Sequence, residues 1–218
     1  MNRNQLTLFI AIVAALLLAR FALYTPEAEK VVIEPPQALQ SLLLPEPRPL
    51  SEFTLSDHNG QPLTQQQLKD KWHFVFFGYT QCPDICPTTL GTLKAVATKL
   101  EAQPEISVDT RFLFVSVDPK RDSVPQLKDY IGYFHPDFIA TTGERQEIDK
   151  LARSLGAIYL FEGDTEKDDY IVNHSASVAL INPQGQWVAR FHPPHTVKQF
   201  HSDYLQLRDY LQPQNSQD

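Results

Sequence analysis

The chain has 218 residues, with 26 acidic and 19 basic side chains and a formal net charge of −7 at pH 7. Nucleic-acid binding requires a basic face, so this balance argues against a nucleic-acid partner. Two cysteines exclude a disulfide framework, and a bond between them would close a loop so short that it adds only about 2 kcal/mol. The two thiols are therefore expected to serve chemistry rather than stability.

Residues 1–24 predict a single-pass membrane anchor. Residues 6–19 are apolar apart from one threonine, and residues 5–24 supply the roughly 20 residues that a membrane-spanning helix needs. A cleaved signal peptide is the alternative, although no cleavage site of the small-x-small type is evident. Arg3 before the run and Glu27 after it favour a cytoplasmic N-terminus. We therefore expect the chain at a bacterial inner membrane, with its domain on the periplasmic side.

Residues 25–49 predict an extended linker, because six prolines crowd a stretch with little hydrophobic periodicity. At about 3.1 Å per residue such a linker reaches up to roughly 75 Å. The alternative is that part of the segment packs on the domain, for which Leu42, Leu43 and Leu44 are apolar enough. Residues 213–218 are expected to form a polar tail.

Residues 50–212 predict a single α/β domain in which a central mixed sheet is flanked by helices. The expected elements are a hairpin at 53–63 with its turn at Asn59-Gly60, a short helix from Thr64 to about Lys71, a strand at 72–79, a helix from about 87 to 100, a strand at 111–117, a helix from 122 or 123 to 133, a short strand at 138–140, a helix at 144–155, a strand at 157–161, a hairpin of strands 177–181 and 187–191, and a helix at 196–211. A cysteine pair at the end of the first core strand is where the thioredoxin-like fold places its active site.

Cys82 and Cys86 lie where the buried strand 72–79 gives way to a helix. At this spacing on a helical turn, their Cα atoms would be about 6 Å apart, within range of a disulfide and of a single metal ion. The positive end of the helix dipole favours thiolates, which are better nucleophiles and better ligands than thiols. Two thiolates suit Cu(I) or Zn(II), and either metal requires a further ligand, for which we consider histidine.

The chain has seven histidines, and one of them stands out as a third ligand. His174 lies in a β-like segment, residues 169–177, that a thioredoxin-like topology places beside the cysteine end of the first core strand. His192 and His195 form an H-x-x-H pair, but the two prolines between them favour an ordinary rigid loop. The other four are expected to be surface or hydrogen-bonded residues: His58, His73, His135 and His201.

The remaining polar and proline residues near the cysteines have simpler interpretations. Pro83 and Pro87 are expected to shape the turn and to start the helix. Asp84 is expected to complement the N-terminus of that helix, with a docking role as the alternative. Asp118 and Asp122 are expected to be turn and cap residues, with a position near the site as the alternative for Asp118, which ends the neighbouring strand.

Three motifs resemble the SCO/SenC family: residues 78–87 (GYTQCPDICP), residues 116–122 (SVDPKRD) and residues 170–175 (YIVNHS). They occur in order and at fitting distances, and the similarity covers about residues 50–211. The resemblance implies a thioredoxin-like domain that binds copper.

The resemblance also implies which residues hold the metal. Copper, as Cu(I) or Cu(II), would be bound by Cys82, Cys86 and His174. One departure is visible, since many members of the family carry aspartate immediately before the histidine and this chain has Asn173. An amide still forms hydrogen bonds but adds no negative charge, so the departure concerns electrostatics or docking rather than the three ligands.

Two functions follow from the resemblance. The first is a metallochaperone that delivers copper to the dinuclear copper centre of cytochrome c oxidase, with other copper chaperones and thiol reductants as further partners. The second is a thiol–disulfide reductase that acts on the cysteines of that centre, with Cys82 and Cys86 as catalytic residues. Thioredoxins use two intervening residues rather than three, and a peroxidase with one reactive cysteine would not explain the second. His174 favours the metal site, because reduction does not need it.

Overall fold

The computed structural model of the chain describes residues 2–23 and 34–212. These residues belong to two compact units, one that ends at Glu34 and one that starts at Pro35, and each is described by itself. The first unit contains a single long helix, α1 (Arg3–Leu23). The helix predicted for the N-terminal segment is therefore present.

The predicted role of this segment as a membrane span is not confirmed. Among the described residues, no helix is both long enough and apolar enough to cross a membrane. In α1 the uncharged stretch between Arg3 and Arg20 comprises residues 4–19.

The second unit is built on the strands of two sheets. The strands are β1 (Leu43–Pro49), β2 (Thr54–Asp57), β3 (Pro62–Thr64), β4 (Trp72–Gly78), β5 (Thr110–Ser116), β6 (Ile139–Thr142), β7 (Tyr159–Glu162), β8 (Ile171–His174), β9 (Val178–Ile181) and β10 (Gln186–Phe191). Eight of them form one mixed sheet in the order β1-β10-β9-β4-β5-β6-β2-β3. β4 lies near its centre, parallel to β5 and antiparallel to β9. β7 and β8 form a separate two-stranded hairpin.

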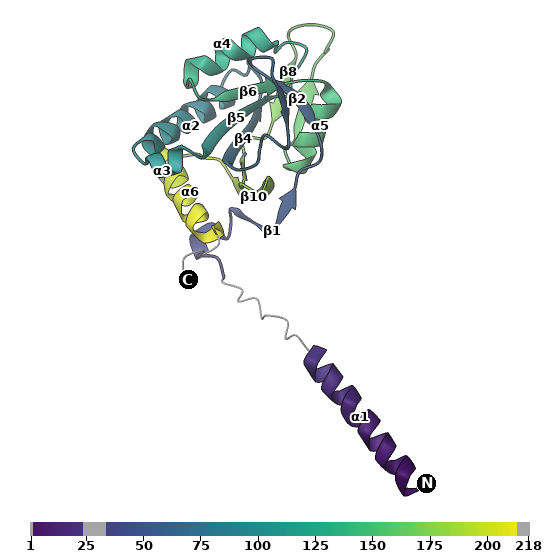
Figure 1. Cartoon of the computed structure of the whole chain (residues 1–218). Helices are drawn as coiled ribbons and strands as arrows, with labels where there is room; N and C mark the ends of the chain where they lie inside the picture. Colours follow the sequence, from purple (N-terminus) through teal and green to yellow (C-terminus); the bar gives the residue numbers. More distant parts are fainter. Residues whose placement is uncertain (1, 24–33, 213–218) are drawn as a thin grey trace. The chain divides into compact units, whose positions relative to one another are not determined.

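Helices cover both faces of the large sheet, as the sequence predicts (Figure 1). They are η1 (Gln37–Leu39), α2 (Ile85–Glu101), α3 (Pro104–Ser107), α4 (Val124–Phe134), α5 (Arg145–Ser154) and α6 (Val197–Leu211). Buried residues of α2, α4 and α6 share one hydrophobic core, and those of α5 share a second core with the β7–β8 hairpin. The hairpin therefore lies on the α5 side of the sheet.

β4 separates these two cores. Trp72, Phe74 and Phe76 point into the core of α2 and α6, whereas Val75 and Phe77 point into the core of α5, as the alternation of a strand requires. All of its residues are buried. The end of β4 is therefore held from both faces, and the turn that follows it starts from a rigid position.

The predicted boundary between linker and domain at residue 50 is too late. η1 and β1 lie within the segment assigned to the linker, and β1 pairs with β10 at the edge of the sheet. Leu39 is fully buried, and Leu42 and Leu43 pack against the same core. The alternative that part of this segment packs on the domain is correct. The predicted linker residues 25–33 and the predicted tail 213–218 lie outside the described residues.

The helix predicted from Thr64 to Lys71 does not form. The segment consists of consecutive turns, in which the N–H groups of Gln67, Leu68 and Lys69 each bond to the carbonyl three residues back. The backbone then turns at Asp70, whose φ is +64°. So short a segment gains little from helix propensity, and only Leu68 within it is buried in a core.

The acid sensitivity of the fold should depend on His73, which lies in β4 and is 3 % exposed. Burial lowers its pKa to about 4, and the nearby charge of Arg111 acts in the same direction. The bond that Nδ1 donates to the Lys71 carbonyl opposes this shift only in part. Between pH 6.5 and about 4 the imidazole of His73 is protonated in the unfolded chain but not in the folded chain. The free energy of unfolding therefore falls as the pH falls through this window. We expect this residue to account for a loss of about 2 kcal/mol between pH 6.5 and pH 4.5.

Urea unfolding at pH 6.5 and at pH 4.5 measures this effect. The variant His73→Gln should lose less stability than the wild type across the interval, because glutamine has no proton to bind. His192→Gln, at an exposed position, serves as the control. Equal losses in the wild type and in His73→Gln would contradict the expectation.

Candidate metal centre

The two cysteines lie in, and directly after, the turn between β4 and α2. Cys82 lies in the turn, where its N–H donates to the Tyr79 carbonyl at 3.2 Å, and Cys86 lies in the first turn of α2. Both thiols are free. Cys86 is fully buried and belongs to the core beneath the turn, whereas Cys82 is partly exposed. One sulfur is therefore anchored in the protein and the other is open to an approaching molecule.

Gly78, the last residue of β4, provides the space for the buried thiol. A Cβ atom at this position would lie 2.5 Å from Sγ of Cys86 and 2.8 Å from Cε2 of Phe114. Contacts this short force the neighbouring atoms to move, and both neighbours belong to the packed core. The glycine is therefore part of the structure that places Cys86.

His174 completes a cluster of three donors. It is the last residue of β8, and its Nε2 lies 3.2 Å from Sγ of Cys86. The donor atoms of Cys82, Cys86 and His174 all lie within 4.8 Å of one another, and they form the one such cluster among the described His, Cys, Asp and Glu residues. The structure thus brings together the three residues that the sequence singles out.

The imidazole of His174 is held in an orientation that suits a ligand. Its Nδ1 lies 3.2 Å from the Ser175 carbonyl, to which only a protonated nitrogen can donate. In the neutral ring, Nε2 is then left with a lone pair directed at the sulfur of Cys86. The rings of Phe76 and Tyr79 pack edge-on against it, at 5.9 and 6.0 Å between centroids. The histidine therefore presents Nε2 to the site before any metal arrives.

The two thiols differ in acidity. A hydrogen bond from the Cys86 thiol, with further bonds from the backbone N–H groups of Asp84 and Cys86, outweighs burial and lowers the pKa of Cys82 to about 4. Burial raises the pKa of Cys86 well above its usual range, and its bond to Cys82 raises it further. At neutral pH Cys82 is therefore a thiolate and Cys86 a thiol that stabilises it.

Alkylation of the reduced, metal-free protein tests this difference. Iodoacetamide should modify Cys82 at a rate that hardly changes between pH 6 and 8, because the thiol is already fully ionised in this range. The alkylation rate of an ordinary thiol instead rises about tenfold per pH unit below its pKa near 8.5. Cys86 should stay unmodified, since it is buried. Peptide mass spectrometry after short exposures gives both rates. A steep rise with pH at Cys82, or equal rates at both cysteines, would contradict the assignment.

Arg121 links the strand of the histidine to the turn of the cysteines. Its Nη1 donates to the carbonyls of Tyr170 at 2.8 Å and Asp168 at 3.1 Å, just before β8. The same nitrogen lies 3.4 Å from Oε1 of Gln81 in the turn. The guanidinium also lies 3.5 Å from the centre of the Tyr170 ring and pairs with Asp118, which accepts a 2.6 Å bond from the Tyr170 hydroxyl. These buried contacts fix the distance between the two halves of the site.

The acidic residues near the cysteines differ in their roles. The carboxylate of Asp122 accepts three hydrogen bonds: from the N–H of Thr80 at 3.0 Å, from the hydroxyl of Thr80 at 2.6 Å and from the hydroxyl of Ser116 at 2.6 Å. It therefore braces the turn, and Ser123 caps α4 instead, in a capping box with Gln126. Asp84 occupies the N-cap position of α2, but its side chain forms no capping bond.

His192 and His195 do not join the cluster. His195 Nε2 donates to the Ala176 carbonyl at 2.7 Å, two residues after His174, and His192 is exposed. The H-x-x-H pair thus behaves as the predicted rigid loop, with one member supporting the segment that follows β8.

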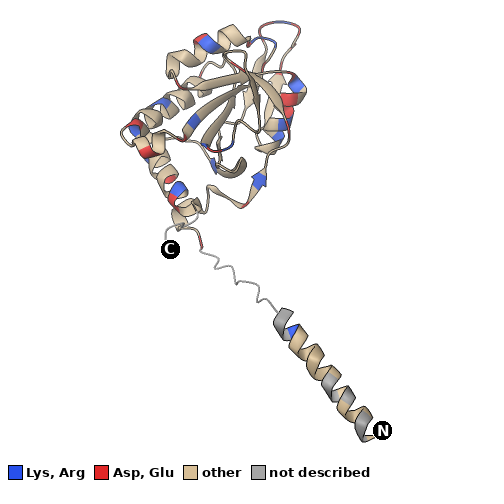
Figure 2. Ribbon diagram, in the orientation of Figure 1, with Lys and Arg blue, Asp and Glu red and all other residues tan. Residues whose placement is uncertain are grey.

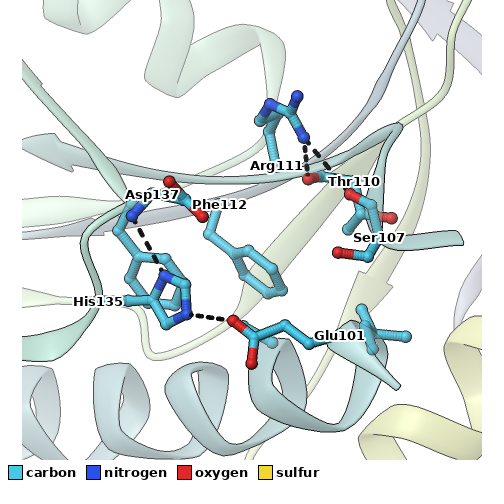
Figure 3. Close-up of a pocket in the computed structure, with 10 residues that line it drawn as sticks. Glu101, Ser107, Thr110, Arg111, Phe112, His135 and Asp137 are labelled. Atoms are coloured by element: carbon cyan, nitrogen blue, oxygen red, sulfur yellow. Dashed lines mark hydrogen bonds and ion pairs between the residues drawn. The ribbon is translucent and has the colours of Figure 1, made fainter. Parts of the chain in front are cut away.

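His135 lies in a different place, a cavity of about 60 Å³ near the C-terminal end of α2 (Figure 3). Its Nδ1 accepts a bond from the N–H of Asp137, so Nε2 donates to Glu101 at 3.1 Å. The prediction of a hydrogen-bonded residue is confirmed here and for His58, His73 and His201.

Fold and site together define a class: a thioredoxin-like α/β domain with a Cys-Cys-His centre at the end of its central strand. The donor set of two sulfurs and one imidazole nitrogen fits a soft ion such as Cu(I). Residues 45–208 match the sequence model of SCO1/SenC. The chain belongs to the SCO1/SenC family.

Relatives of known sequence agree with this assignment. A protein of Stutzerimonas stutzeri that is named for copper binding is 40% identical over 144 residues, which cover 66% of this chain and 69% of that protein. The mitochondrial SCO2 homologue of Mus musculus is 38% identical over 134 residues. That match covers 62% of this chain and 52% of the mouse protein, so the chain spans about half of the longer relative.

Solved structures agree as well. ScoI of Arabidopsis thaliana with copper bound superposes with a TM-score of 0.67 at 34% identity, over 73% of this chain and 98% of that one. ScoI of Bradyrhizobium japonicum with copper bound gives 0.64 at 32% identity, over 75% and 99%. The thioredoxin-like fold predicted from the sequence is confirmed.

Proposed function

We propose that this protein binds one copper ion through Cys82, Cys86 and His174 and delivers it to the dinuclear copper centre of cytochrome c oxidase during assembly. The observation that carries the proposal is the cluster itself, in which three donor atoms lie within 4.8 Å of one another. The orientation of His174 supports it, because a hydrogen bond to Ser175 directs the free Nε2 toward the sulfurs. Membership of the SCO1/SenC family and the copper-bound relatives support it further.

The burial of the ligands suits release as well as binding. Cys86 is fully buried, and the imidazole of His174 is oriented by its bond to Ser175, so these two donors are fixed by the fold. Cys82 and His174 are both partly exposed, so an acceptor ligand reaches the site from their side. A three-donor site leaves room for an incoming thiolate or imidazole, which then replaces the donors of this chain one at a time.

Mixing experiments test delivery. The Cu(I)-loaded protein is combined with the metal-free, reduced copper-site domain of the oxidase subunit, and the copper content of each is measured after separation. Copper should move to the oxidase domain. Retention of all copper by this protein, with an acceptor that does take up copper from a small-molecule complex, would contradict delivery.

A second candidate function is reduction of the disulfide in the oxidase copper site. The favouring observation is the pairing of a low-pKa, partly exposed Cys82 with a buried, protonated Cys86. The Cys82 thiolate would attack one sulfur of the client disulfide and release the other as a thiolate. Cys86 would then lose its proton to that leaving thiolate and displace the client, giving a Cys82–Cys86 disulfide and a reduced client.

The variant His174→Ala separates the two functions. Reduction uses the cysteines alone, so thiol release from an oxidised copper-site domain should persist in this variant while copper transfer declines. If instead copper binding and transfer are unchanged in His174→Ala, and only thiol release depends on the cysteines, the reductase is the function of the site.

We also propose that the N-terminal segment attaches the domain to the bacterial inner membrane, with the domain on the periplasmic side. Arg3 before the apolar run and Glu27 after it support this orientation. Fractionation of cells that produce the full chain, followed by alkaline carbonate extraction, should leave it with the membranes, and protease added to spheroplasts should degrade the domain. Recovery in the soluble fraction would contradict attachment.

A further inference from the structure

The β7–β8 hairpin has two different faces. Tyr159 pairs with His174 and Phe161 pairs with Val172, and these residues face the metal centre and the second core. The alternate pairs, Leu160 with Asn173 and Glu162 with Ile171, point the other way. One strand therefore carries a metal-site residue on one face and a free surface on the other.

The outward face is apolar and uncovered. Ile158, Leu160 and Ile171 are 69 %, 66 % and 53 % exposed. Leu160 and Ile171 are diagonal neighbours across the strand pair, and Ile158 accepts a backbone bond from Ser175 at the same end as His174. Three branched side chains gathered on one exposed hairpin face are typical of a protein contact, because single exposed apolar residues are normally scattered.

The tip of the hairpin supplies the charge. The stretch from Glu162 to Asp169 contains five acidic residues and one lysine, and it lies on the loop above β8 (Figure 2). Lys167 pairs with Asp164 at 3.8 Å. Among residues 34–212, no basic side chain forms an ion pair with Glu166 or Asp168. Lys120 also reaches the loop and donates to the Thr165 carbonyl at 2.6 Å, so the loop offers a partner a reduced but still net negative charge.

Charge complementarity identifies the occupant. A second copy of this chain in a two-fold arrangement would bring two acidic loops together, which repel each other. A partner with lysine or arginine beside an apolar contact meets both features at once. The net charge of −7 points the same way.

We propose that the outward face of the β7–β8 hairpin, formed by Ile158, Leu160 and Ile171 and bordered by the acidic loop 162–169, docks a protein with an apolar contact surface rimmed by basic residues. Resting on the proposed function, this partner is the copper-receiving protein. A partner docked there contacts β8, the strand that carries His174, so it lies next to the three copper ligands from which it takes the metal.

Binding measurements with the copper-site domain of the oxidase subunit as probe test the proposal. Affinity is measured by isothermal titration with the copper-loaded full chain in detergent, at 50 and 300 mM salt. Leu160→Ser combined with Ile171→Ser should weaken binding by about tenfold or more. Glu166→Lys combined with Asp169→Lys should weaken it mainly at low salt, because screening removes the contribution of exposed charges.

Matched control variants lie at the opposite end of the sheet. Val108→Ser removes an apolar side chain that is 67 % exposed, just before β5, and Glu105→Lys reverses an exposed charge in α3. Both should leave probe affinity within about twofold of the wild type, since surface changes away from an interface have little effect. All variants should bind copper as the wild type does, which shows that the hairpin is still folded around His174.

The outcomes separate this proposal from the proposed function. Hairpin variants that bind the probe as tightly as the controls would overturn the docking surface, as would a wild type that does not bind the probe. Copper transfer is scored separately, at saturating probe. If binding depends on the hairpin but no copper moves, the docking surface stands and delivery fails.

Discussion

Replacing Cys86 by serine is expected to abolish tight copper binding. The sulfur lies fully buried within 4.8 Å of the other two donors, and a hydroxyl in its place is a poor ligand for Cu(I). Loss of an outer-shell partner already costs roughly 10- to 100-fold in metal affinity, so loss of this ligand should cost more than about a hundredfold. Cys82→Ser should behave similarly, and His174→Ala should weaken binding without abolishing it.

Competition with a chromophoric Cu(I) chelator measures these affinities. His192→Ala is the matched control for His174→Ala, because it removes an exposed histidine that does not join the cluster. Thermal unfolding of each metal-free variant verifies that the fold persists. A Cys86→Ser protein that holds copper as tightly as the wild type would show that the metal sits elsewhere.

The variant Gly78→Ala should damage both the fold and the site. Its new methyl group would meet Sγ of Cys86 at 2.5 Å and the ring of Phe114 at 2.8 Å. Overpacking of this kind typically costs about 1–3 kcal/mol, and the displaced sulfur no longer lies beside Nε2 of His174. We expect a lower free energy of unfolding together with a copper affinity reduced by about tenfold or more, given the loss that misplaced ligand support brings.

Gly91→Ala provides the comparison within the same helix as Cys86. Gly91 lies in α2 with open space around its Cβ position, so alanine there should stabilise the protein by about 0.5–1 kcal/mol through helix propensity. Urea unfolding and chelator competition on both variants separate packing at Gly78 from a general effect of glycine replacement. A Gly78→Ala protein with unaltered affinity would show that the sulfur tolerates displacement.

Local sequence patterns predict much of the fold. β4 is predicted because an apolar run ends in a turn, and α4 because Asp122 or Ser123 is a typical N-cap, of which the structure selects Ser123. The strand at 43–49 is not predicted, because its three prolines suggest an extended linker and give no indication of a sheet partner. An edge strand tolerates proline, and its pairing with β10 depends on tertiary structure alone.

The site divides in the same way. The cysteine pair is visible from its spacing and its position after β4, and the resemblance of the sequence to a family points to His174. Arg121 is not identified, although it stands in a quoted motif, because its contacts reach Gln81 and Tyr170, 40 and 49 positions away. The sequence does contain a signal for it, because a basic residue between two aspartates at the end of a buried strand favours a buried ion pair. Gly78 gives no signal at all, since its role lies in the space it leaves.

The distance between Cys86 and His174 along the chain, 88 positions, has a consequence for synthesis. At 5–20 residues per second, the ribosome completes the histidine roughly 4 to 18 s after the cysteine. Throughout that interval the nascent chain holds both thiols without the imidazole, and Arg121 has not yet met the carbonyl of Tyr170. A chain that stops before residue 170 contains β4, α2 and both sulfurs but cannot assemble the centre, so capture of copper by all three donors belongs to the finished protein.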